Sequence, residues 1–556
     1  MTAEQRPQTV ADLLLRRGGD SRPGLRTFER TWSWDEVVRA SAARAALAQR
    51  LRRPGPFHIG VLLNNVPEFA FWLGAAALAG ATIVGINSTK RGEYLEQEVA
   101  HTDCQLIITD AAGLELLRGL DVGVAPDRYL LIDTPQYAEL VAGESDAPAV
   151  APEVGPATRM LLLFTSGTTG ASKAAICSQS RLVGLGYMNR NRFGLVADDV
   201  CYCCMPMFHG NALMALWAPA LVAGACIALT PRFSASRFLP EVRAYGATYF
   251  TYVGKAVGYL LATPARPDDG DNPLVHAFGT EASPADREEF LRRFGCPLTE
   301  GFGSSEAGGF VLPGPDTPPN ALGRPTGPNV VVVDPETRQV CPPAVLDEHG
   351  RVTNAEESVG AIVDLNGEAK FEGYYKNPEA NAEKIRHGWY WTGDLGYVDG
   401  AGFMYFAGRE GDWIRVDGEN ISALHVERVL QRHPAVVAAS VFAVPDPRSG
   451  DQVMAAVEVS PATTFDDLRL TEFLAAQDDL GSKDLPRYVR FSYGLPTTGS
   501  GKIRKKDVKV EGWRCADPVY WWAGRTGPAY TPMTDDDKRL MREEFQTNGR
   551  LRFLPM

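Results

Sequence analysis

Between about Leu51 and Tyr405, the chain alternates short, apolar, β-prone runs with segments that favour helices. The β-prone runs include HIGVLL, ATIVGI, QLIITD, MLLLFT, ACIALT, TYFTYV and LVHAFG. Strands that are apolar on both faces and separated by helices are typical of parallel sheets covered by helices. We therefore predict an α/β fold, in which a large N-terminal domain contains stacked, mostly parallel sheets.

Two changes of pattern predict further units. The Pro- and Gly-rich interval VLPGPDTPPNALGRPTGPN precedes VVVVD and predicts loops that lead into a β-rich subdomain. After Glu410, two amphipathic segments, LHVERVLQRHP and DLRLTEFLAAQ, alternate with β-prone runs. Because one core rarely exceeds about 250–300 residues, 556 residues predict several domains. We place a large N-terminal domain at residues 1–409 and a small α+β domain at 410–556.

The net charge and the composition of the uncharged runs argue against two classes of protein, nucleic-acid binders and membrane-spanning proteins. A net charge of −12 and a pI of about 5.3 disfavour a nucleic-acid binder, which is usually basic. Two uncharged windows, Phe69–Ile86 and Ala212–Leu229, approach the length of a membrane-spanning helix. Their internal Gly and Pro residues instead favour a buried helix, a turn and a buried strand in each window. The N-terminus lacks the apolar core of a secretory signal.

The chain has nine cysteines at irregular spacing, which indicates free thiols in a reducing compartment. Cys201, Cys203 and Cys204 lie near His209, but they lack the paired spacing of a zinc site, so we predict buried core residues. The expected location is cytoplasmic. Peripheral membrane contact and a homodimer are left open.

The stretch LLLFTSGTTGASK, residues 161–173, runs from an apolar strand into a loop rich in glycine and hydroxyl groups. Such loops hold phosphate through backbone N–H groups, helped by hydroxyls and an ammonium group. The spacing G-x-x-G-x-x-K differs from that of the Walker loop. The alternative is a flexible surface loop. The candidate phosphate-binding residues are Thr165, Ser166, Gly167, Thr168, Thr169, Gly170 and Lys173.

Four further stretches carry polar side chains in suggestive settings. They are GFGSSEAGG with Phe302, Gly303, Ser305 and Glu306, HGWYWTGDLG with Asp394, GREGDWIRVDGENIS with Arg409 and Gly411, and LPTTGSGKIRKKD with Lys502. Each has an ordinary structural alternative, because acidic residues cap helices and basic residues form surface ion pairs. Their combined order along the chain is hard to attribute to coincidence.

These motifs resemble, in the same order, the signatures of the adenylate-forming superfamily, which includes acyl- and aryl-CoA synthetases, luciferases and peptide-synthetase adenylation domains. The resemblance extends from about Trp32 to Arg552. It is greatest to the fatty acid transport protein and very-long-chain acyl-CoA synthetase branch, through TYVGKAVGYLLATP, GDWIRVDGENIS and the tail after YWWAGRTGP. Actinobacterial relatives act on sterol side-chain acids as well as fatty acids.

The resemblance implies an AMP-forming acid–thiol ligase that uses ATP, Mg²⁺ and coenzyme A. It would activate a hydrophobic acid, either a long-chain fatty acid or a steroid side-chain acid, as an acyl-adenylate and then form the thioester. An anionic acid must approach a polyanion, so the site must concentrate positive charge. Residues 165–173 would hold the β- and γ-phosphates, and Ser305 the α-phosphate. Glu306 would hold Mg²⁺.

The remaining expected roles concern the nucleoside and the moving domain. Phe302 would lie against adenine, and the ribose would be bound by Asp394 and Arg409. The segment between adenine and acyl group would contain Gly279 and Thr280. Lys502 would bridge the acid and the α-phosphate from the small domain, and the hinge position holds Gly411, which allows wide backbone rotation.

The sequence specifies the acid substrate less closely than it specifies the nucleotide. The stretch MPMFHGNAL offers no Asp for a substrate ammonium, which disfavours amino acids. Phe208, Gly303 and Trp217 are candidate pocket walls, and His209 either gates the acyl channel or is a core histidine. A fatty acyl-AMP ligase that hands the acyl group to a carrier protein, and a non-catalytic lipid-acid binding or uptake protein, are the alternatives. The chain after the GKIRKK run is too short for an attached carrier domain.

Overall fold

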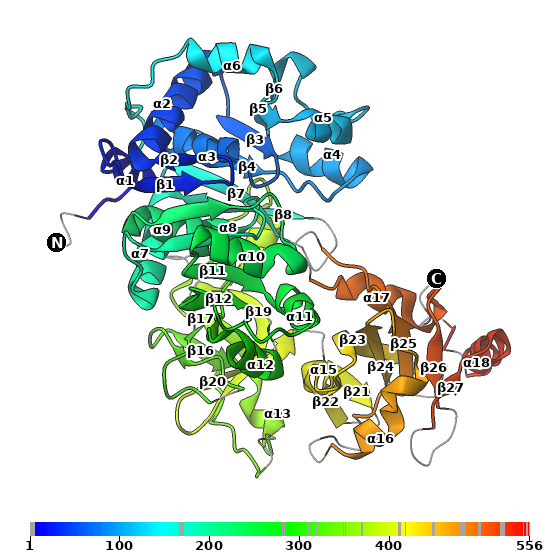
Figure 1. Ribbon diagram of the computed structural model, residues 1–556. Helices are drawn as coiled ribbons and strands as arrows, with labels where there is room; N and C mark the ends of the chain where they lie inside the picture. Colours follow the sequence, from blue (N-terminus) through cyan, green and yellow to red (C-terminus); the bar gives the residue numbers. More distant parts are fainter. Residues whose placement is uncertain are drawn as a thin grey trace.

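The computed structural model describes the whole chain except residues 1–5, 166–171, 281, 283, 308–310, 319, 349, 351, 368–370, 410–412, 417–418, 448–450, 478–479, 481–483, 499–501, 523–528, 549, 552–553 and 555–556. Within the described residues, a large α/β body in three tiers is followed by a smaller unit at one side (Figure 1). This arrangement confirms the predicted fold class.

The upper tier is a six-stranded sheet in the order β6-β5-β3-β4-β7-β8. Its strands are β3 (His58–Leu62), β4 (Thr82–Gly85), β5 (Cys104–Thr109), β6 (Tyr129–Leu131), β7 (Arg159–Thr165) and β8 (Lys173–Ser178). All neighbours are parallel except the β7–β8 pair. Around them lie α2 (Trp34–Leu51), α3 (Pro67–Ala79), α4 (Gly92–His101), α5 (Ala111–Leu117) and α6 (Pro135–Ala142) (Figure 1).

The middle tier is a seven-stranded sheet in the order β13-β12-β11-β9-β10-β1-β2. Its strands are β1 (Pro23–Arg26), β2 (Thr31–Ser33), β9 (Val200–Cys203), β10 (Cys226–Leu229), β11 (Tyr249–Val253), β12 (His276–Thr280) and β13 (Leu298–Glu300). Only β1 and β2 pair antiparallel. The helices of this tier are α1 (Val10–Leu15), α7 (Gln179–Phe193), α8 (Gly210–Ala212), α9 (Ala218–Ala223), α10 (Ala235–Tyr245), α11 (Gly254–Leu261) and α12 (Pro284–Phe294).

Both uncharged windows fold as the sequence predicts. In the first, α3 ends at Gly80, whose φ of +69° is left-handed, and β4 follows. In the second, α9 ends at Gly224, with φ of +75°, before β10. Glycine ends a helix in this conformation without a Cβ clash. No helix among the described residues is long and apolar enough to cross a membrane.

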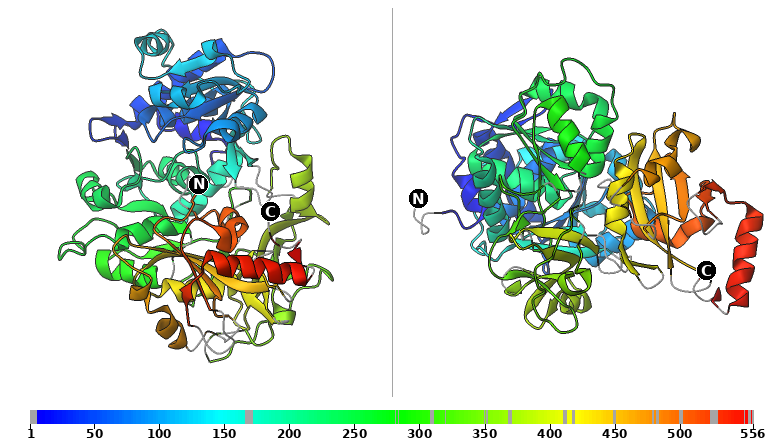
Figure 2. Two further views of the ribbon diagram at one scale, coloured as in Figure 1. Left: turned by 90° about the vertical axis from the view of Figure 1, so that its right-hand side faces the viewer. Right: turned by 90° about the horizontal axis from the view of Figure 1, so that it is seen from below.

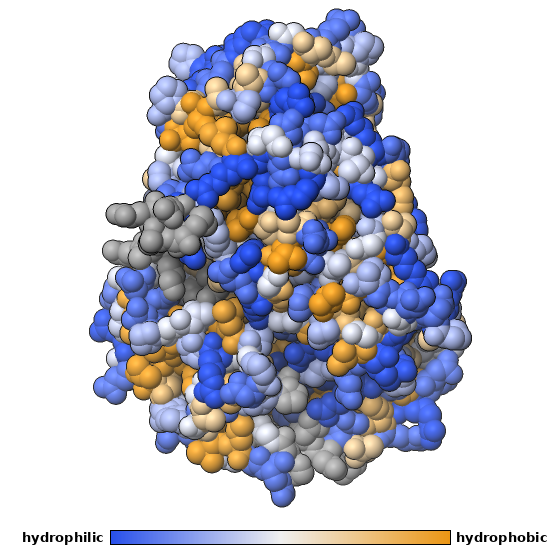
Figure 3. All heavy atoms as spheres, turned by 60° about the vertical axis from the view of Figure 1, so that its left-hand side comes forward, coloured by the Kyte–Doolittle hydropathy of each residue, from blue (hydrophilic) through white to orange (hydrophobic). Residues whose placement is uncertain are grey.

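On the face shown in Figure 3, hydrophobic residues form several separate groups among polar ones. Cys201, Cys203 and Cys204 are buried in the core, as predicted.

The lower tier is a mainly antiparallel sheet in the order β16-β17-β19-β18, with β20 on β19. Its strands are β16 (Val330–Val333), β17 (Gly360–Asp364), β18 (Ile385–Arg386), β19 (Trp389–Val398) and β20 (Met404–Arg409). Nearby lie β14 (Val311–Leu312), β15 (Arg324–Pro325), α13 (Ala355–Ser358) and α14 (Pro378–Lys384). This sheet corresponds to the predicted β-rich subdomain.

The smaller unit contains a five-stranded sheet in the order β23-β24-β25-β26-β27. Its strands are β23 (Val436–Pro445), β24 (Asp451–Val459), β25 (Tyr488–Ser492), β26 (Val519–Trp521) and β27 (Thr531–Pro532), and the hairpin β21 (Trp413–Val416) and β22 (Glu419–Ser422) precedes them. Its helices are α15 (Ala423–Gln431), α16 (Leu470–Ala475), α17 (Lys505–Glu511) and α18 (Asp535–Thr547). Figures 1 and 2 show it beside α11 of the large body. The boundary at residue 409 stays a prediction.

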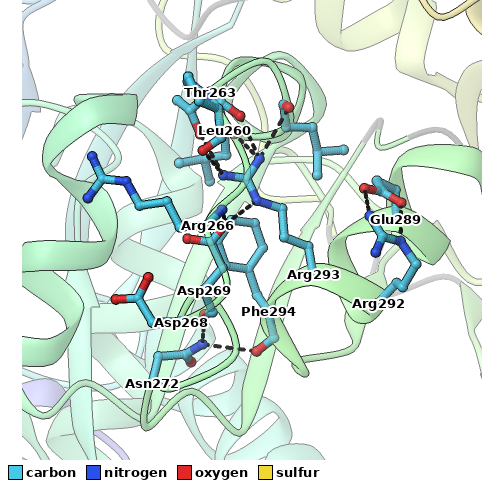
Figure 4. Close-up of polar contacts among 12 residues, drawn as sticks. Leu260, Thr263, Arg266, Asp268, Asp269, Asn272, Glu289, Arg292, Arg293 and Phe294 are labelled. Carbon is cyan, nitrogen blue, oxygen red and sulfur yellow. Dashed lines mark hydrogen bonds and ion pairs between the residues drawn. The ribbon is translucent and has the colours of Figure 1, made fainter.

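A buried arginine fastens the loop between α11 and β12 (Figure 4). Arg293 of α12 donates from Nε to Asp269 Oδ2 at 2.6 Å and from Nη1 to the carbonyl oxygen of Thr263 at 2.8 Å. It also donates to the carbonyls of Leu260 and Pro264. This network fixes the end of α11, the helix that faces the smaller unit.

Candidate active site

The predicted phosphate loop joins two paired strand ends. Thr165 ends β7 directly opposite Lys173, the first residue of β8. Residues Ser166, Gly167, Thr168, Thr169 and Gly170 lie outside the described residues. The Lys173 side chain is 11% exposed, with Nζ 3.2 Å from Glu383 Oε2 and 5.5 Å from the centre of the Tyr374 ring.

Lys90 is a second lysine at the carboxyl edge of the upper sheet, and it was not identified from the sequence. Lys90 pairs with Glu98 and donates from Nζ to Ser172 Oγ at 2.6 Å. It follows β4, the strand beside β7, so the common carboxyl edge of parallel strands was the signal that could have identified it.

The loop after β13 carries the candidate metal ligand. Tyr374 donates its hydroxyl to Glu306 Oε1 at 3.1 Å. Burial acts to raise the pKa of Glu306, but the charge of Lys384 and several hydrogen bonds hold the pKa below its ordinary value. Lys384 itself donates to the carbonyl of Thr392 at 2.6 Å. Glu306 is therefore ionised and partly buried, a setting that would suit the binding of a hard cation.

Ser305 lies directly against the segment that begins the predicted acyl pocket. A Cβ built on Gly210 would come within 2.8 Å of Ser305 Oγ, so a larger residue here would require the Ser305 side chain to move. Arg181 of α7 holds the other side of the loop by donating to the carbonyl of Ser305 at 2.8 Å. The predicted phosphate-binding and acyl-binding segments are thus neighbours.

His209 lies where three distant parts of the chain meet. Its ring centre is 4.5 Å from that of Phe208, and its Nε2 is buried without a hydrogen-bond partner among the described residues. Burial lowers the pKa of His209 to about 4, with the charges of Lys502 and Lys90 adding to the effect. The charge of Lys502 in the small unit therefore acts on His209 in the large body. The imidazole is neutral at physiological pH.

A buried ion pair between the two units supports the position of Lys502. Lys255 Nζ of α11 lies 3.1 Å from Glu458 Oε2 of β24, and the side chains are 10% and 6% exposed. The same Glu458 oxygen accepts the backbone N–H of Leu495 at 2.9 Å. Leu495 precedes the turn in which Thr498 N–H donates to the carbonyl of Lys502 at 2.7 Å. Glu458 therefore links α11 to the segment that presents Lys502.

The predicted nucleoside residues lie on neighbouring elements. Asp394 of β19 is directly opposite Arg409 of β20, whose side chain is outside the described atoms. Tyr390 of the same strand contacts Ser304 Oγ through its hydroxyl at 3.4 Å, which brings β19 to the loop that holds Glu306. The ring centre of Phe302 is 6.1 Å from that of Phe406.

Gly279 and Thr280 end β12 beside β11. A Cβ on Gly279 would overlap the carbonyl oxygen of Tyr252, so this approach of two strands requires glycine. Gly303 is exposed in the loop after β13, and Gly411 lies outside the described residues. The assigned roles of all these residues stay predictions.

The predicted acyl segment contains a π-helix, Leu213–Trp217, and Trp217 is 4% exposed. Tyr249 donates its hydroxyl to the carbonyl of Ala215 at 2.7 Å, and Asn189 Nδ2 donates to that of Met214 at 3.2 Å. π-Helical turns often occur at functional sites. The supporting residues come from β11 and α7, and no local sequence signal identifies them.

Residues 16–375 match the family described as AMP-binding enzyme, and residues 425–502 match the AMP-binding enzyme C-terminal domain. The chain is 62% identical over 547 residues to the steroid-22-oyl-CoA synthetase of Rhodococcus jostii (strain RHA1), with 98% of this chain and 99% of that protein covered. It is 43% identical over 513 residues to the medium/long-chain-fatty-acid–CoA ligase FadD17 of Mycobacterium tuberculosis, with 92% and 98% covered.

Two solved structures share the fold. The anthranilate CoA ligase AuaEII in complex with anthranoyl-AMP has a TM-score of 0.79 at 21% identity, over 91% of this chain and 98% of that one. ATP-bound MatB from Rhodopseudomonas palustris has a TM-score of 0.76 at 23% identity, over 90% and 98%.

Proposed function

The chain belongs to the AMP-binding enzyme family, and from this premise we propose that its acid substrate is a steroid that carries a side-chain carboxylate. It is an ATP-dependent acyl-CoA ligase, with ATP and coenzyme A as substrates. The observation that carries the proposal is the 62% identity to a steroid-22-oyl-CoA synthetase across 98% of the chain. The 43% identity to FadD17 supports a medium- or long-chain fatty acid as the second candidate.

The reaction has two steps. A carboxylate oxygen of the acid attacks the α-phosphorus of ATP, the bond to pyrophosphate breaks, and an acyl-adenylate forms. The thiolate of coenzyme A then attacks the acyl carbonyl, and AMP leaves with the bonding electron pair. The first step brings an anion to a polyanion, so its barrier depends on positive charge near the phosphates.

Three lysines lie around this point, of which Lys173 and Lys90 are paired with Glu383 and Glu98. Lys173 and Lys90 flank the phosphate loop, and the charge of Lys502 acts on His209, beside the segment that contacts Ser305. In the proposed mechanism, Lys502 neutralises the developing charge between the carboxylate and the α-phosphate, and its compact ammonium can serve both groups. The small unit then rotates about Gly411 and withdraws Lys502, which admits coenzyme A.

Glu306 would hold Mg²⁺. The donor set fits this ion, because Mg²⁺ bound with a nucleotide commonly takes one or two protein carboxylates together with phosphate oxygens. When bound, the ion offsets the charge of the phosphates. Asp394 and Arg409 would bind the ribose, and Phe302 would lie against adenine.

The nine cysteines of the chain are free thiols, which supports a reducing, cytoplasmic compartment.

The test is a pyrophosphate-release assay with a C22 steroid acid, a medium-chain and a long-chain fatty acid, each with and without coenzyme A. We expect kcat/KM for the steroid acid to exceed the others by about tenfold or more, equivalent to roughly 1.4 kcal/mol. A higher value for either fatty acid would overturn the steroid assignment. Pyrophosphate release without consumption of coenzyme A would instead identify an acyl-AMP ligase.

A further inference from the structure

Arg192 lies near the end of α7. None of the roles proposed above for the candidate active site involves its guanidinium group. Its guanidinium carbon lies 5.3 Å from the ring centre of Phe193 and 5.2 Å from that of Phe278. Both terminal nitrogens, Nη1 and Nη2, are buried without a hydrogen-bond partner among the described residues. The two aromatic rings interact with the cation but accept none of these N–H groups in the manner of an oxygen atom.

The buried N–H groups of Arg192 require a hydrogen-bond acceptor that the described residues do not supply. Burial lowers the pKa of Arg192, and the hydroxyl groups of Tyr249 and Tyr252 oppose that shift. A guanidinium nevertheless stays charged in proteins, so its N–H groups need acceptors once water is excluded. Buried polar groups of native proteins are almost always paired, with protein, water or ligand.

The contacts of Arg192 connect it to the start of the nucleotide loop and to the far part of the predicted acyl segment. Phe278, under the guanidinium, directly precedes Gly279, and its ring lies against Gly301 at the start of the nucleotide loop. Phe193, the next residue along α7, has its ring centre 5.3 Å from that of Tyr249. Tyr249 in turn holds the π-helix of the acyl segment. Arg192 is therefore linked through Phe278 to the nucleotide loop and through Phe193 and Tyr249 to the acyl segment.

This far part of the acyl segment is remote from the reacting carboxylate. The acyl segment touches Ser305 at Gly210, and Tyr249 binds it at Ala215. Tyr249 thus binds the acyl segment five residues, more than one helical turn, beyond the point where the segment touches Ser305. Figures 1 and 2 show α7 on the side of the large body that faces away from the unit carrying Lys502.

We propose that Arg192 binds an acceptor oxygen at the end of the acyl group remote from its carboxylate, and thereby selects oxygenated steroid acids over fatty acids. This inference rests on the proposed function. A fatty acid ends in a methyl group, which would cover the buried N–H groups without pairing them. A steroid commonly carries a keto or hydroxyl oxygen at the ring end opposite the side chain, and that oxygen pairs with the guanidinium.

The test compares two steroid acids that differ only in this ring oxygen. For the wild-type enzyme, we expect kcat/KM for pyrophosphate release to be much higher with the oxygenated acid, because a site built to hydrogen-bond an oxygen rejects the analogue that lacks it. Arg192→Met, which keeps an unbranched apolar side chain, should lower kcat/KM for the oxygenated acid by roughly a hundredfold, mostly through KM. The deoxy acid should change less than about threefold.

Arg190→Met is the matched control, because it makes the same substitution two residues earlier in α7, where the guanidinium donates to exposed Asn191. It should leave the ratio between the two acids unchanged. Arg192→Lys keeps the positive charge and some hydrogen-bond donors, so it should retain part of the preference for the oxygenated acid. This variant replaces Arg192→Met in the test if Arg192→Met folds poorly.

Equal losses on both acids, or an unchanged ratio, would overturn the inference and indicate a structural role or a bound water molecule. A wild-type preference for a fatty acid over both steroid acids would instead contradict the proposed function. These two outcomes can be distinguished. Failure of the inference about Arg192 is measured by comparing Arg192→Met with the wild-type enzyme, whereas failure of the proposed function is measured by comparing substrates of the wild-type enzyme alone.

Discussion

Lys502 is the residue on which the first half-reaction most depends. After burial, the charge of Lys502 is the largest influence that lowers the pKa of the His209 imidazole. We expect Lys502→Ala to slow ATP–pyrophosphate exchange by about 100- to 1,000-fold, as loss of one preorganised charge-stabilising group commonly does. Thioester formation from supplied acyl-adenylate should change little. Lys506→Ala, at an exposed lysine of α17, is the matched control. Exchange at the wild-type rate in Lys502→Ala would refute the assignment.

His209 makes a separate prediction about pH and stability. Burial, then the charges of Lys502 and Lys90, lower its pKa to about 4 in the folded protein, against about 6.5 in the unfolded chain. The unfolded state therefore takes up the proton first as the pH falls. The stabilising contribution of the neutral ring is complete above about pH 6.5 and is lost between pH 6.5 and 4, by roughly 3 kcal/mol.

We therefore expect His209→Gln to flatten the pH dependence of the free energy of unfolding in this window, measured by urea denaturation at several pH values. Parallel curves for the variant and the wild type would show that His209 titrates normally in the folded protein.

Among the elements, α11 and α12 depend on the arginine shown in Figure 4. Arg293→Met would leave Asp269, 4% exposed, buried without its cation. Removing one partner of a buried pair typically costs about 3–5 kcal/mol. The adjacent Arg292 offers a matched control, because it pairs with Glu289 on the surface, and Arg292→Met should cost less than about 1 kcal/mol. Equal midpoints for the two variants in thermal unfolding would contradict this prediction.

How well the elements could be predicted depends on how local their causes are. The helix–turn–strand units around Gly80 and Gly224 were predictable, because uncharged runs must be buried and glycine permits the left-handed turn. The π-helix was not, since Tyr249 and Asn189 support it from other elements. At the candidate site, the motifs indicated Ser305 and Glu306, whose roles stay predictions. Lys90 stands in no such motif, although its position after β4 could have indicated it. Arg192 stands in no motif either, and only the folded chain brings Phe278 against its guanidinium.

At the scale of the whole molecule, the two units meet through the ion pair of Lys255 and Glu458. Glu458 also accepts the N–H of Leu495, ahead of the turn that presents Lys502. If the small unit must rotate between half-reactions, this pair favours the arrangement that supports adenylation. We expect Lys255→Ala to slow pyrophosphate exchange by about tenfold, roughly 1.4 kcal/mol, and to leave thioester formation from supplied acyl-adenylate unchanged or faster.

A double-mutant cycle separates this pair from general damage to the interface. Glu458→Gln keeps an oxygen that can accept the Leu495 N–H but removes the charge that Lys255 meets. If the two residues act through one contact, each single variant should slow exchange and the double variant should be little slower than either, with a coupling energy of about 1–3 kcal/mol. Additive effects would mean that the residues act independently. An equal loss in both half-reactions would mean that the pair stabilises the protein without favouring one arrangement of its units.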